Sequence, residues 1–166
     1  IVQELKRLVR GGGSTLFEQT DVNEVVTVVA DLSKHSINKA TDEFHLDLES
    51  HLPMIPADRI GLEQVILNLL QNACQALPSR DKAIEIRTTR AADWIQIEVI
   101  DEGIGIPEEN LSDIAESFFT TKGEAGGTGL GLSVSLRILK EHGGTLTFKS
   151  EVGHGTTAVA RLPLSR

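Results

Sequence analysis

The stretch from residue 101 to residue 133 contains, in this order, Asp101-Glu-Gly-Ile-Gly-Ile-Pro107, Phe118-Phe-Thr-Thr-Lys122 and Gly126-Gly-Thr-Gly-Leu-Gly-Leu-Ser133. A fourth motif, Asn68-Leu-Leu-Gln-Asn72, lies upstream on a helix-forming segment. Together they supply a carboxylate, glycine turns, a polar connection and a glycine-led helix, in the order that suits a purine followed by phosphates. The commoner nucleotide folds are excluded, because the chain has no GxxxxGK(S/T) motif. Its loose GxGxxA match at 153–158 is followed by only eight residues, too few for a βαβ unit.

These motifs together resemble the ATP-binding catalytic domain of sensor histidine kinases, within the superfamily that also contains gyrase B, MutL and the large heat-shock chaperone ATPase. The resemblance covers roughly residues 20–164. It implies an α+β fold: a two-layer α/β sandwich with three main helices on one face of a mixed, mostly antiparallel sheet, and a flexible ATP lid. Residues 1–15 are then the end of a preceding helix and a linker, and residues 16–166 the ATP-binding catalytic domain. Asn72-Ala-Cys-Gln-Ala-Leu77 with the Phe118 motif looks most like the nitrogen- and dicarboxylate-sensing branch.

The hydrophobic periodicity leads to the same architecture. Asp21 is suited to cap a helix, with Glu24 in the capping-box position. Helices are expected at 22–32, 59–77 and 129–142, and strands at 45–49, 83–89, 94–100, 145–149 and 156–162. The segment 107–127 is polar, rich in glycine and long for a connection, which indicates a functional lid. Because each helix has an apolar face to cover and the strands form hairpins, we expect the helices to pack on one side of a mixed sheet.

Composition restricts the class of protein and its partners. A chain of 166 residues suits one domain, and the net charge of −8 argues against a nucleic-acid-binding surface. No apolar stretch approaches the ~20 residues that cross a bilayer. The single cysteine, Cys74, excludes an internal disulfide and is compatible with a reducing compartment. We therefore expect a cytoplasmic domain without direct membrane contact, in a parent protein that is either soluble or anchored in the inner membrane.

The motif that begins at Asp101 is expected to recognise the base. A carboxylate at a strand end suits the exocyclic amine of adenine and would repel a guanine carbonyl; the alternative is an aspartate that only caps a turn. Gly103 and Gly105 allow the backbone to turn and to approach the base closely. The resemblance adds Ile106 as an apolar contact to the purine. It also places Thr156 near the adenine, with an ordinary strand-edge threonine as the alternative.

Asn68 and Asn72 lie one turn apart at the edge of the apolar stripe of helix 59–77. Both are expected in the nucleotide site and at the reaction centre. The resemblance implies that Asn72 ligates Mg²⁺, an ion that keeps its waters and needs few protein oxygens. Asn68 stands where the ATP-hydrolysing relatives carry a glutamate general base. Because an amide cannot take a proton from water, a kinase that protects its ATP is favoured over an ATPase.

The phosphates are expected at the glycine-led start of the last helix, which comprises Gly127, Thr128, Gly129, Leu130 and Gly131. Free N–H groups and the positive helix end make an anion site there, and the threonine can add a hydroxyl donor. Lys122 is a candidate catalytic contact to the β- or γ-phosphate, or else it is a solvated side chain. Gln75 and Ala76 stand where many family members carry a basic residue and an adenine-stacking tyrosine, which leaves Lys122 more of the phosphate charge to neutralise.

None of the five histidines has the following acidic residue, with a proline four to five residues further on, that marks the family's phosphoacceptor. We therefore predict the catalytic domain of a two-component sensor histidine kinase. It would transfer the γ-phosphoryl of Mg-ATP to a histidine on a dimerisation domain absent from this chain, and a response regulator is the further partner implied. Two alternatives stay open: a non-catalytic ATP- or ADP-binding sensor module, and an ATPase of the same superfamily.

Overall fold

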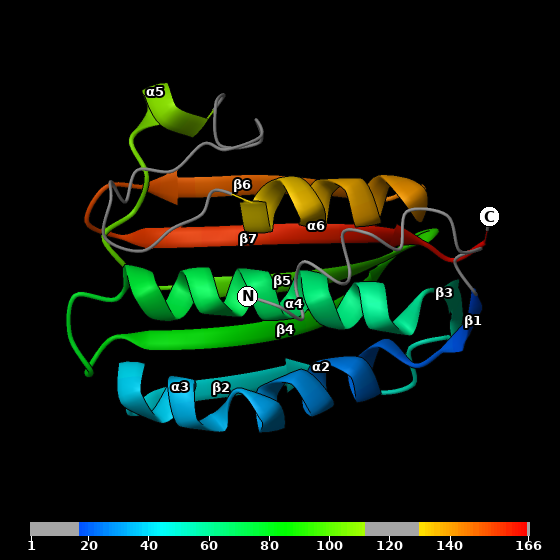
Figure 1. The fold of residues 1–166 in the computed structure, drawn as a ribbon, viewed down its shortest axis with the longest axis horizontal. Helices are drawn as coiled ribbons and strands as arrows, with labels where there is room; N and C mark the ends of the chain where they lie inside the picture. Colours follow the sequence, from blue (N-terminus) through cyan, green and yellow to red (C-terminus); the bar gives the residue numbers. More distant parts are fainter. Residues whose placement is uncertain (1–16, 112–129, 166) are drawn as a thin grey trace.

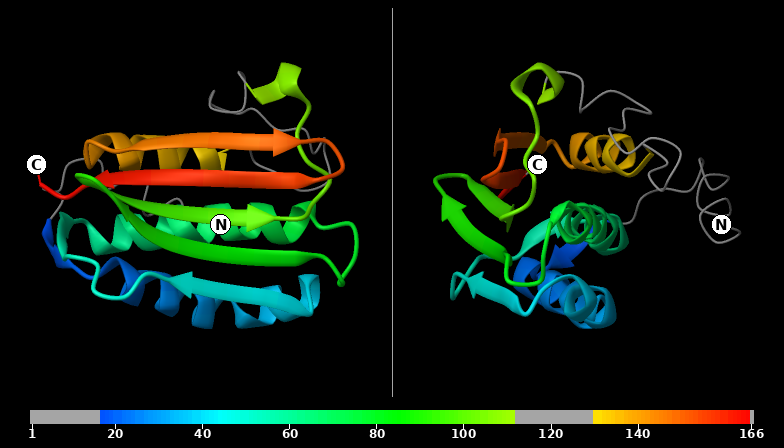
Figure 2. Two further views of the ribbon diagram at one scale, coloured as in Figure 1. Left: turned by 180° about the vertical axis from the view of Figure 1, so that it is seen from behind. Right: turned by 90° about the vertical axis from the view of Figure 1, so that its left-hand side faces the viewer.

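The computed structural model describes residues 17–111 and 130–165, which form a two-layer sandwich (Figure 1). One layer consists of helices α2 (Val22–Leu32), α3 (Lys34–Ala40), α4 (Arg59–Ala76) and α6 (Leu130–Glu141). The other is a sheet of strands β2 (Glu43–Leu48), β4 (Ala83–Ala91), β5 (Trp94–Asp101), β6 (Thr145–Glu151) and β7 (Gly155–Pro163). The right-hand view of Figure 2 shows these helices on one side of the sheet. The predicted sandwich with three main helices on one face is confirmed.

The main sheet has the strand order β2-β4-β5-β7-β6. Strand β2 is parallel to β4, whereas the other three neighbouring pairs are antiparallel, so the sheet is mixed and mostly antiparallel as predicted. The parallel pair requires a long crossover, which α4 supplies together with the short strand β3 (Ile55–Ala57). Strand β3 pairs with β1 (Glu18–Thr20) in a separate two-stranded sheet. The order of the strands places β5 at the centre between β4 and β7, with β6 at the edge beside β7.

The core lies between the two layers, because alternate residues of β4 and β5 point toward the helices and are buried. Helix α4 packs against both α2 and α6 and supplies the middle of the helical layer. Burying one large aliphatic side chain stabilises the fold by about 1.5–3 kcal/mol. The largest fully buried side chains come from both layers and include Leu62, Ile66, Leu70, Ile84, Ile86, Ile95, Ile97, Leu139 and Leu162. The predicted site residues on α4, β5 and β7 belong to the same elements that form this core.

A buried histidine ties the C-terminal end of α6 to the N-terminal end of α4. His142 is 3% exposed, and its Nδ1 donates to the carbonyl of Ile138 at 2.7 Å. Its Nε2 accepts a hydrogen bond from the backbone N–H of Asp58 at 2.9 Å. The ring of Phe17 lies 4.7 Å from the histidine ring, centroid to centroid. This residue is therefore structural, in agreement with the absence of a phosphoacceptor sequence around it.

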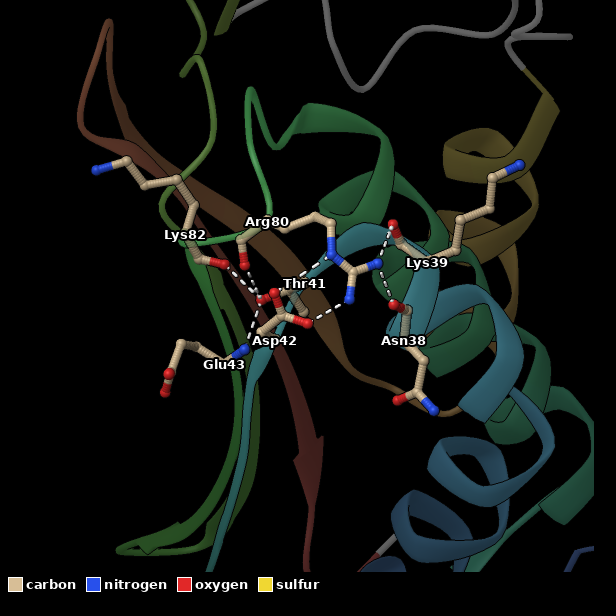
Figure 3. Close-up of polar contacts among 7 residues, drawn as sticks. All are labelled: Asn38, Lys39, Thr41, Asp42, Glu43, Arg80 and Lys82. Atoms are coloured by element: carbon tan, nitrogen blue, oxygen red, sulfur yellow. Dashed lines mark hydrogen bonds and ion pairs between the residues drawn. The ribbon is translucent and has the colours of Figure 1, made fainter.

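A cluster around Arg80 joins the end of α3 to the connection between α4 and β4 (Figure 3). The guanidinium donates to the carbonyl oxygens of Asn38 and Lys39, at 2.7 and 3.3 Å, in the last turn of α3. It also forms a bidentate ion pair with Asp42. Nε contacts Oδ2 at 3.2 Å, and Nη2 contacts Oδ1. Cations at helix C-termini satisfy carbonyls that have no partner within the helix. The cluster thus sets where β2 enters the sheet beside β4.

The structure differs from the sequence prediction at short elements. Helix α3 and strands β1 and β3 are not predicted, because segments of three to seven residues carry little periodicity. Strand β2 begins two residues earlier and ends one residue earlier than expected. Pro56 lies inside β3, where a strand that is paired on one side only tolerates a proline. No helix in the ranges 17–111 and 130–165 is long and apolar enough to cross a membrane.

Candidate functional site

One face of α4 connects the two halves of the predicted site. Asn68, Asn72 and Ala76 follow one another at four-residue intervals, so they lie one turn apart along the same edge. At one end, the carbonyl of Ala76 accepts a hydrogen bond from the N–H of Ile104, in the loop after β5. At the other end, Asn68 contacts Gly131 in the first turn of α6. This edge of α4 therefore runs from the loop after β5, which is expected to recognise the base, to the start of α6. Asn72 lies between the two.

Asp101 is the last residue of β5 and is 7% exposed. Its Oδ1 accepts a hydrogen bond from the N–H of Gly103 at 2.8 Å. A side chain at position 103 would place its Cβ 2.5 Å from this oxygen and 2.7 Å from the Cβ of Ala76. A glycine is therefore required for the loop to fold back onto both the carboxylate and α4. The backbone turn expected at this position is present, and its approach to a base stays a prediction.

The next glycine packs against the opposite side of the site. Gly105 has φ +72°, and a Cβ there would lie 2.1 Å from the carbonyl oxygen of Glu151 in the hairpin between β6 and β7. Left-handed backbone and close approach both favour glycine at this position. The loop after β5 is also bonded to that hairpin through the N–H of Gly153, which donates to the carbonyl of Ile104 at 2.9 Å. Residues 101–106 are thereby held between α4 and the β6–β7 hairpin.

A row of three polar residues crosses the sheet at this end. Thr156 is paired with Asp101 on one side and with Ser150 on the other, so the three side chains lie in register on β5, β7 and β6. The neighbouring row on the same face is apolar and consists of Val99, Ala158 and Phe148. The polar row therefore stands at the border of the core, facing the helical layer. Sequence reasoning identified two of its members and missed Ser150, because nothing local marks a serine within an alternating strand.

Ser150 links the row to the loop after β5. Its hydroxyl accepts a hydrogen bond from the N–H of Ile106 at 2.8 Å and donates to the carbonyl of Gly155 at 2.9 Å. It also lies 2.7 Å from the hydroxyl of Thr156. The structure thus brings the predicted base-recognition residues together, and Ser150 connects Thr156 with the loop after β5.

Asn68 is half-buried and bonded on both sides of its amide. The nitrogen donates to the carbonyl of Gly131 at 2.9 Å and to the hydroxyl of Ser135 at 3.1 Å, while the oxygen accepts from Gln64 at 2.8 Å. Ser135 is fully buried and donates to the same carbonyl at 2.9 Å. The side chain of Asn68 therefore joins α4 to the first turn of α6. A direct contact between Asn68 and nucleotide stays a prediction.

Asn72 is exposed, and within the described residues its side chain has no hydrogen-bond partner. Its amide oxygen is consequently available to a ligand. In the same part of the chain, no group of three or more His, Cys, Asp or Glu side chains gathers in a way that could hold a metal ion. A cation at this site would depend on Asn72, water and the oxygens of a bound phosphate, a shell that fits Mg²⁺. The donor set therefore fits the expected ion.

The remaining predicted residues belong to the phosphate end. Lys122, Gly127, Thr128 and Gly129, and the lid expected within 107–127, fall wholly or largely outside the described residues. Leu130 begins α6, and Gly131 follows it. A Cβ at position 131 would lie 3.6 Å or more from the nearest atoms of Asn68, which is ordinary contact. Among the described residues, no atom requires a glycine at position 131.

Two open grooves lie away from this site, on either side of Arg80. One, of about 580 Å³, runs between α2, α3 and β2, and the other, of about 550 Å³, runs between α3 and the end of α4. Cys74 lines the second groove, and its partial burial raises the pKa of the thiol. Within residues 17–111 and 130–165, a buried carboxylate and glycines required by close contacts meet at the α4–β5–β7 site and not at these grooves.

Comparison with known proteins gives consistent matches. The family described as histidine kinase-, DNA gyrase B-, and HSP90-like ATPase matches residues 57–166. Sporulation kinase E of Bacillus subtilis is 34% identical over 149 residues, which are 90% of this chain and 20% of that protein. The signal transduction histidine-protein kinase AtoS of Escherichia coli is 37% identical over 166 residues, covering 99% of this chain and 27% of AtoS. The chain thus spans less than a third of the length of both curated relatives.

Among solved structures, a crystal structure of histidine kinase ThkA in complex with response regulator protein TrrA has a TM-score of 0.78 and 27% sequence identity. The superposition covers 98% of this chain and 47% of that one. The similarity therefore extends over both layers of the sandwich.

Proposed function

Because the chain belongs to the family of histidine kinase-, DNA gyrase B-, and HSP90-like ATPases, we propose that it binds Mg-ATP and acts as the catalytic domain of a two-component sensor histidine kinase. The phosphoryl acceptor in this proposal is a histidine of a dimerisation domain outside residues 1–166. The domain itself is homologous to two-component histidine kinases along nearly its whole length.

The observation that carries this proposal is the buried carboxylate of Asp101 beside Gly103. A buried carboxylate requires hydrogen-bond donors, and the N–H of Gly103 is one of them. The exocyclic amine of adenine is a suitable further donor, and the loop between Gly103 and Ile106 would lie against the base. Thr156, in register with Asp101, is the second polar group offered to the purine.

The phosphates would lie toward the start of α6. Asn72 is the proposed Mg²⁺ ligand, because its amide is exposed on the α4 edge between the base motif and α6. The ion would neutralise phosphate charge. Lys122 and the glycine-led segment 127–131 are proposed as phosphate contacts on the strength of their sequence alone. The chain's own part is to bind, orient and shield the triphosphate rather than to form a covalent bond.

Slow hydrolysis of ATP is part of the proposal. Asn68 cannot act as a general base, because an amide does not accept a proton from water. Its side chain instead links α4 to α6 through hydrogen bonds to Gly131 and Ser135, and its oxygen accepts a hydrogen bond from Gln64. This favours phosphotransfer over the ATPase alternative. The non-catalytic sensor alternative uses the same binding residues and is separated from the kinase only by a transfer assay.

The proposal extends to a further partner and to a location. ThkA was crystallised with a response regulator, and we propose that a response regulator receives the phosphoryl group in the pathway of this protein too. Its net charge of −8 gives no support to a nucleic-acid partner. We place the domain in the cytoplasm, where ATP and a reducing environment are available.

The test is a radiolabelled phosphotransfer assay with γ-labelled ATP. The chain alone should bind Mg-ATP, hydrolyse it very slowly and acquire no acid-labile phosphate. With a cognate helical hairpin added, label should appear on the histidine of the hairpin. Brisk turnover without the hairpin would establish the ATPase alternative, and binding without transfer to any cognate hairpin would establish the sensor.

A further inference from the structure

The hydroxyl of Ser150 has three neighbours, and their chemistry decides where its proton goes. A serine hydroxyl has one donor and two acceptor lone pairs. The backbone N–H of Ile106 can only donate, so Ser150 accepts there; the carbonyl of Gly155 can only accept, so Ser150 donates there. The single proton of Ser150 is then used.

The third contact, between Ser150 and Thr156 at 2.7 Å, must therefore use the proton of Thr156. Once its proton is committed to Ser150, the hydroxyl of Thr156 has only lone pairs left for any other partner. Thr156 is in register with Asp101 on the neighbouring strand, and both side chains lie on the face toward the helices. A ligand against this row thus meets a carboxylate and a hydroxyl that both act as acceptors.

We infer that Ser150 is a specificity-determining residue. It makes Thr156 a hydrogen-bond acceptor, and the site therefore favours a purine with an amino group at position 6. This inference rests on the proposed ATP binding at Asp101. Adenine presents an amino group at position 6, whereas hypoxanthine and guanine present a carbonyl oxygen there. An acceptor cannot bond a carbonyl oxygen, and leaving both unpaired in a desolvated site is costly.

Ser150 also has a purely structural role to be separated from this one. Its bond to Ile106 attaches the loop after β5 to the β6–β7 hairpin, so its removal would loosen the wall of the site. Loosening weakens every purine nucleotide alike. Without Ser150, the Thr156 hydroxyl is free to rotate and can donate its proton to a carbonyl oxygen of the base. This changes the ratio of the affinities for the two nucleotides. The ratio of affinities therefore separates the two roles.

The experiment measures the dissociation constants of Mg-ATP and Mg-ITP for the 166-residue chain by calorimetry. Ser150→Ala should lower the preference for ATP over ITP by about fivefold, the factor that one ordinary hydrogen bond supplies. Ser150→Thr, which keeps the hydroxyl, should retain the wild-type ratio. In a Thr156→Val background, Ser150→Ala should leave the ratio unchanged, because the hydroxyl it orients is gone.

Thr156→Val alone provides a check that does not depend on the folding of Ser150→Ala. It should lower the preference for ATP by removing the acceptor, whereas Thr156→Ser should not. Equal weakening of ATP and ITP in Ser150→Ala, or an unchanged ratio in Thr156→Val, would overturn the inference while the proposed function stands. Failure of the wild-type chain to bind either nucleotide would instead refute the proposed function.

Discussion

Replacement of Asp101 by asparagine tests base recognition with little change in shape. The carboxylate is 7% exposed, and its Oδ1 receives the N–H of Gly103 at 2.8 Å. The asparagine oxygen can keep that bond, so the amide NH₂ replaces Oδ2 and turns an acceptor into a donor. ATP then loses a hydrogen bond to a charged group, worth about 1.5–3 kcal/mol, and its dissociation constant should rise roughly 10- to 150-fold. Binding of GTP should suffer less, because its carbonyl oxygen can accept from the new NH₂.

Calorimetric titration of wild type and Asp101→Asn with ATP and with GTP measures both effects. Thermal unfolding reports whether the domain stays folded, with an expected cost of about 1 kcal/mol for exchanging a charged acceptor for a neutral one. Asp81→Asn is the matched control: this carboxyl is exposed, and a hydrogen bond from Ser79 lowers its pKa. The Asp81→Asn substitution should leave the affinities for ATP and GTP unchanged. An unchanged ratio of ATP to GTP affinity in Asp101→Asn would refute the reasoning about the base.

Three further outcomes are expected. Asn72→Ala should abolish the part of ATP affinity that depends on Mg²⁺ and leave the affinity measured in EDTA as it is; an equal loss under both conditions would contradict a ligand role. Burial raises the pKa of the Cys74 thiol, so the thiolate forms at higher pH in the native chain than in the unfolded one. Iodoacetamide at pH 8.5 should therefore alkylate the native chain more slowly than the chain in urea, as followed by mass, and equal rates would disprove this. The same shift makes this contribution to stability complete below the thiol pKa of the unfolded chain and lost as the pH rises through the higher folded value. His142→Ala should lower the free energy of unfolding by about 1–3 kcal/mol, because the N–H of Asp58 loses its acceptor; a urea midpoint equal to that of wild type would argue against this.

Local patterns were sufficient for most of the fold. The alternation of buried residues in β5 and the apolar stripe of α4 follow from periods of two and of 3.6 residues, which any window of the sequence contains. The helix cap at Asp21 is confirmed, since its Oδ1 accepts from the N–H groups of Asn23 and Glu24. The backbone turn expected at Gly103 and Gly105 is present, and contacts to protein atoms require glycine there, whereas the approach to a base stays a prediction.

The sequence by itself determined the types of the long elements, the layered architecture and the motifs that point to a nucleotide, because these depend on neighbours along the chain. Only the tertiary structure decided which side chains meet across strands and helices. Strand register placed Asp101, Ser150 and Thr156 in one row, although 55 positions separate Asp101 from Thr156. Helix packing turned Asn68 toward Gly131 and Ser135 and left Asn72 exposed. Contacts between distant segments depend on pairing and packing of the whole core, which no short window of sequence encodes.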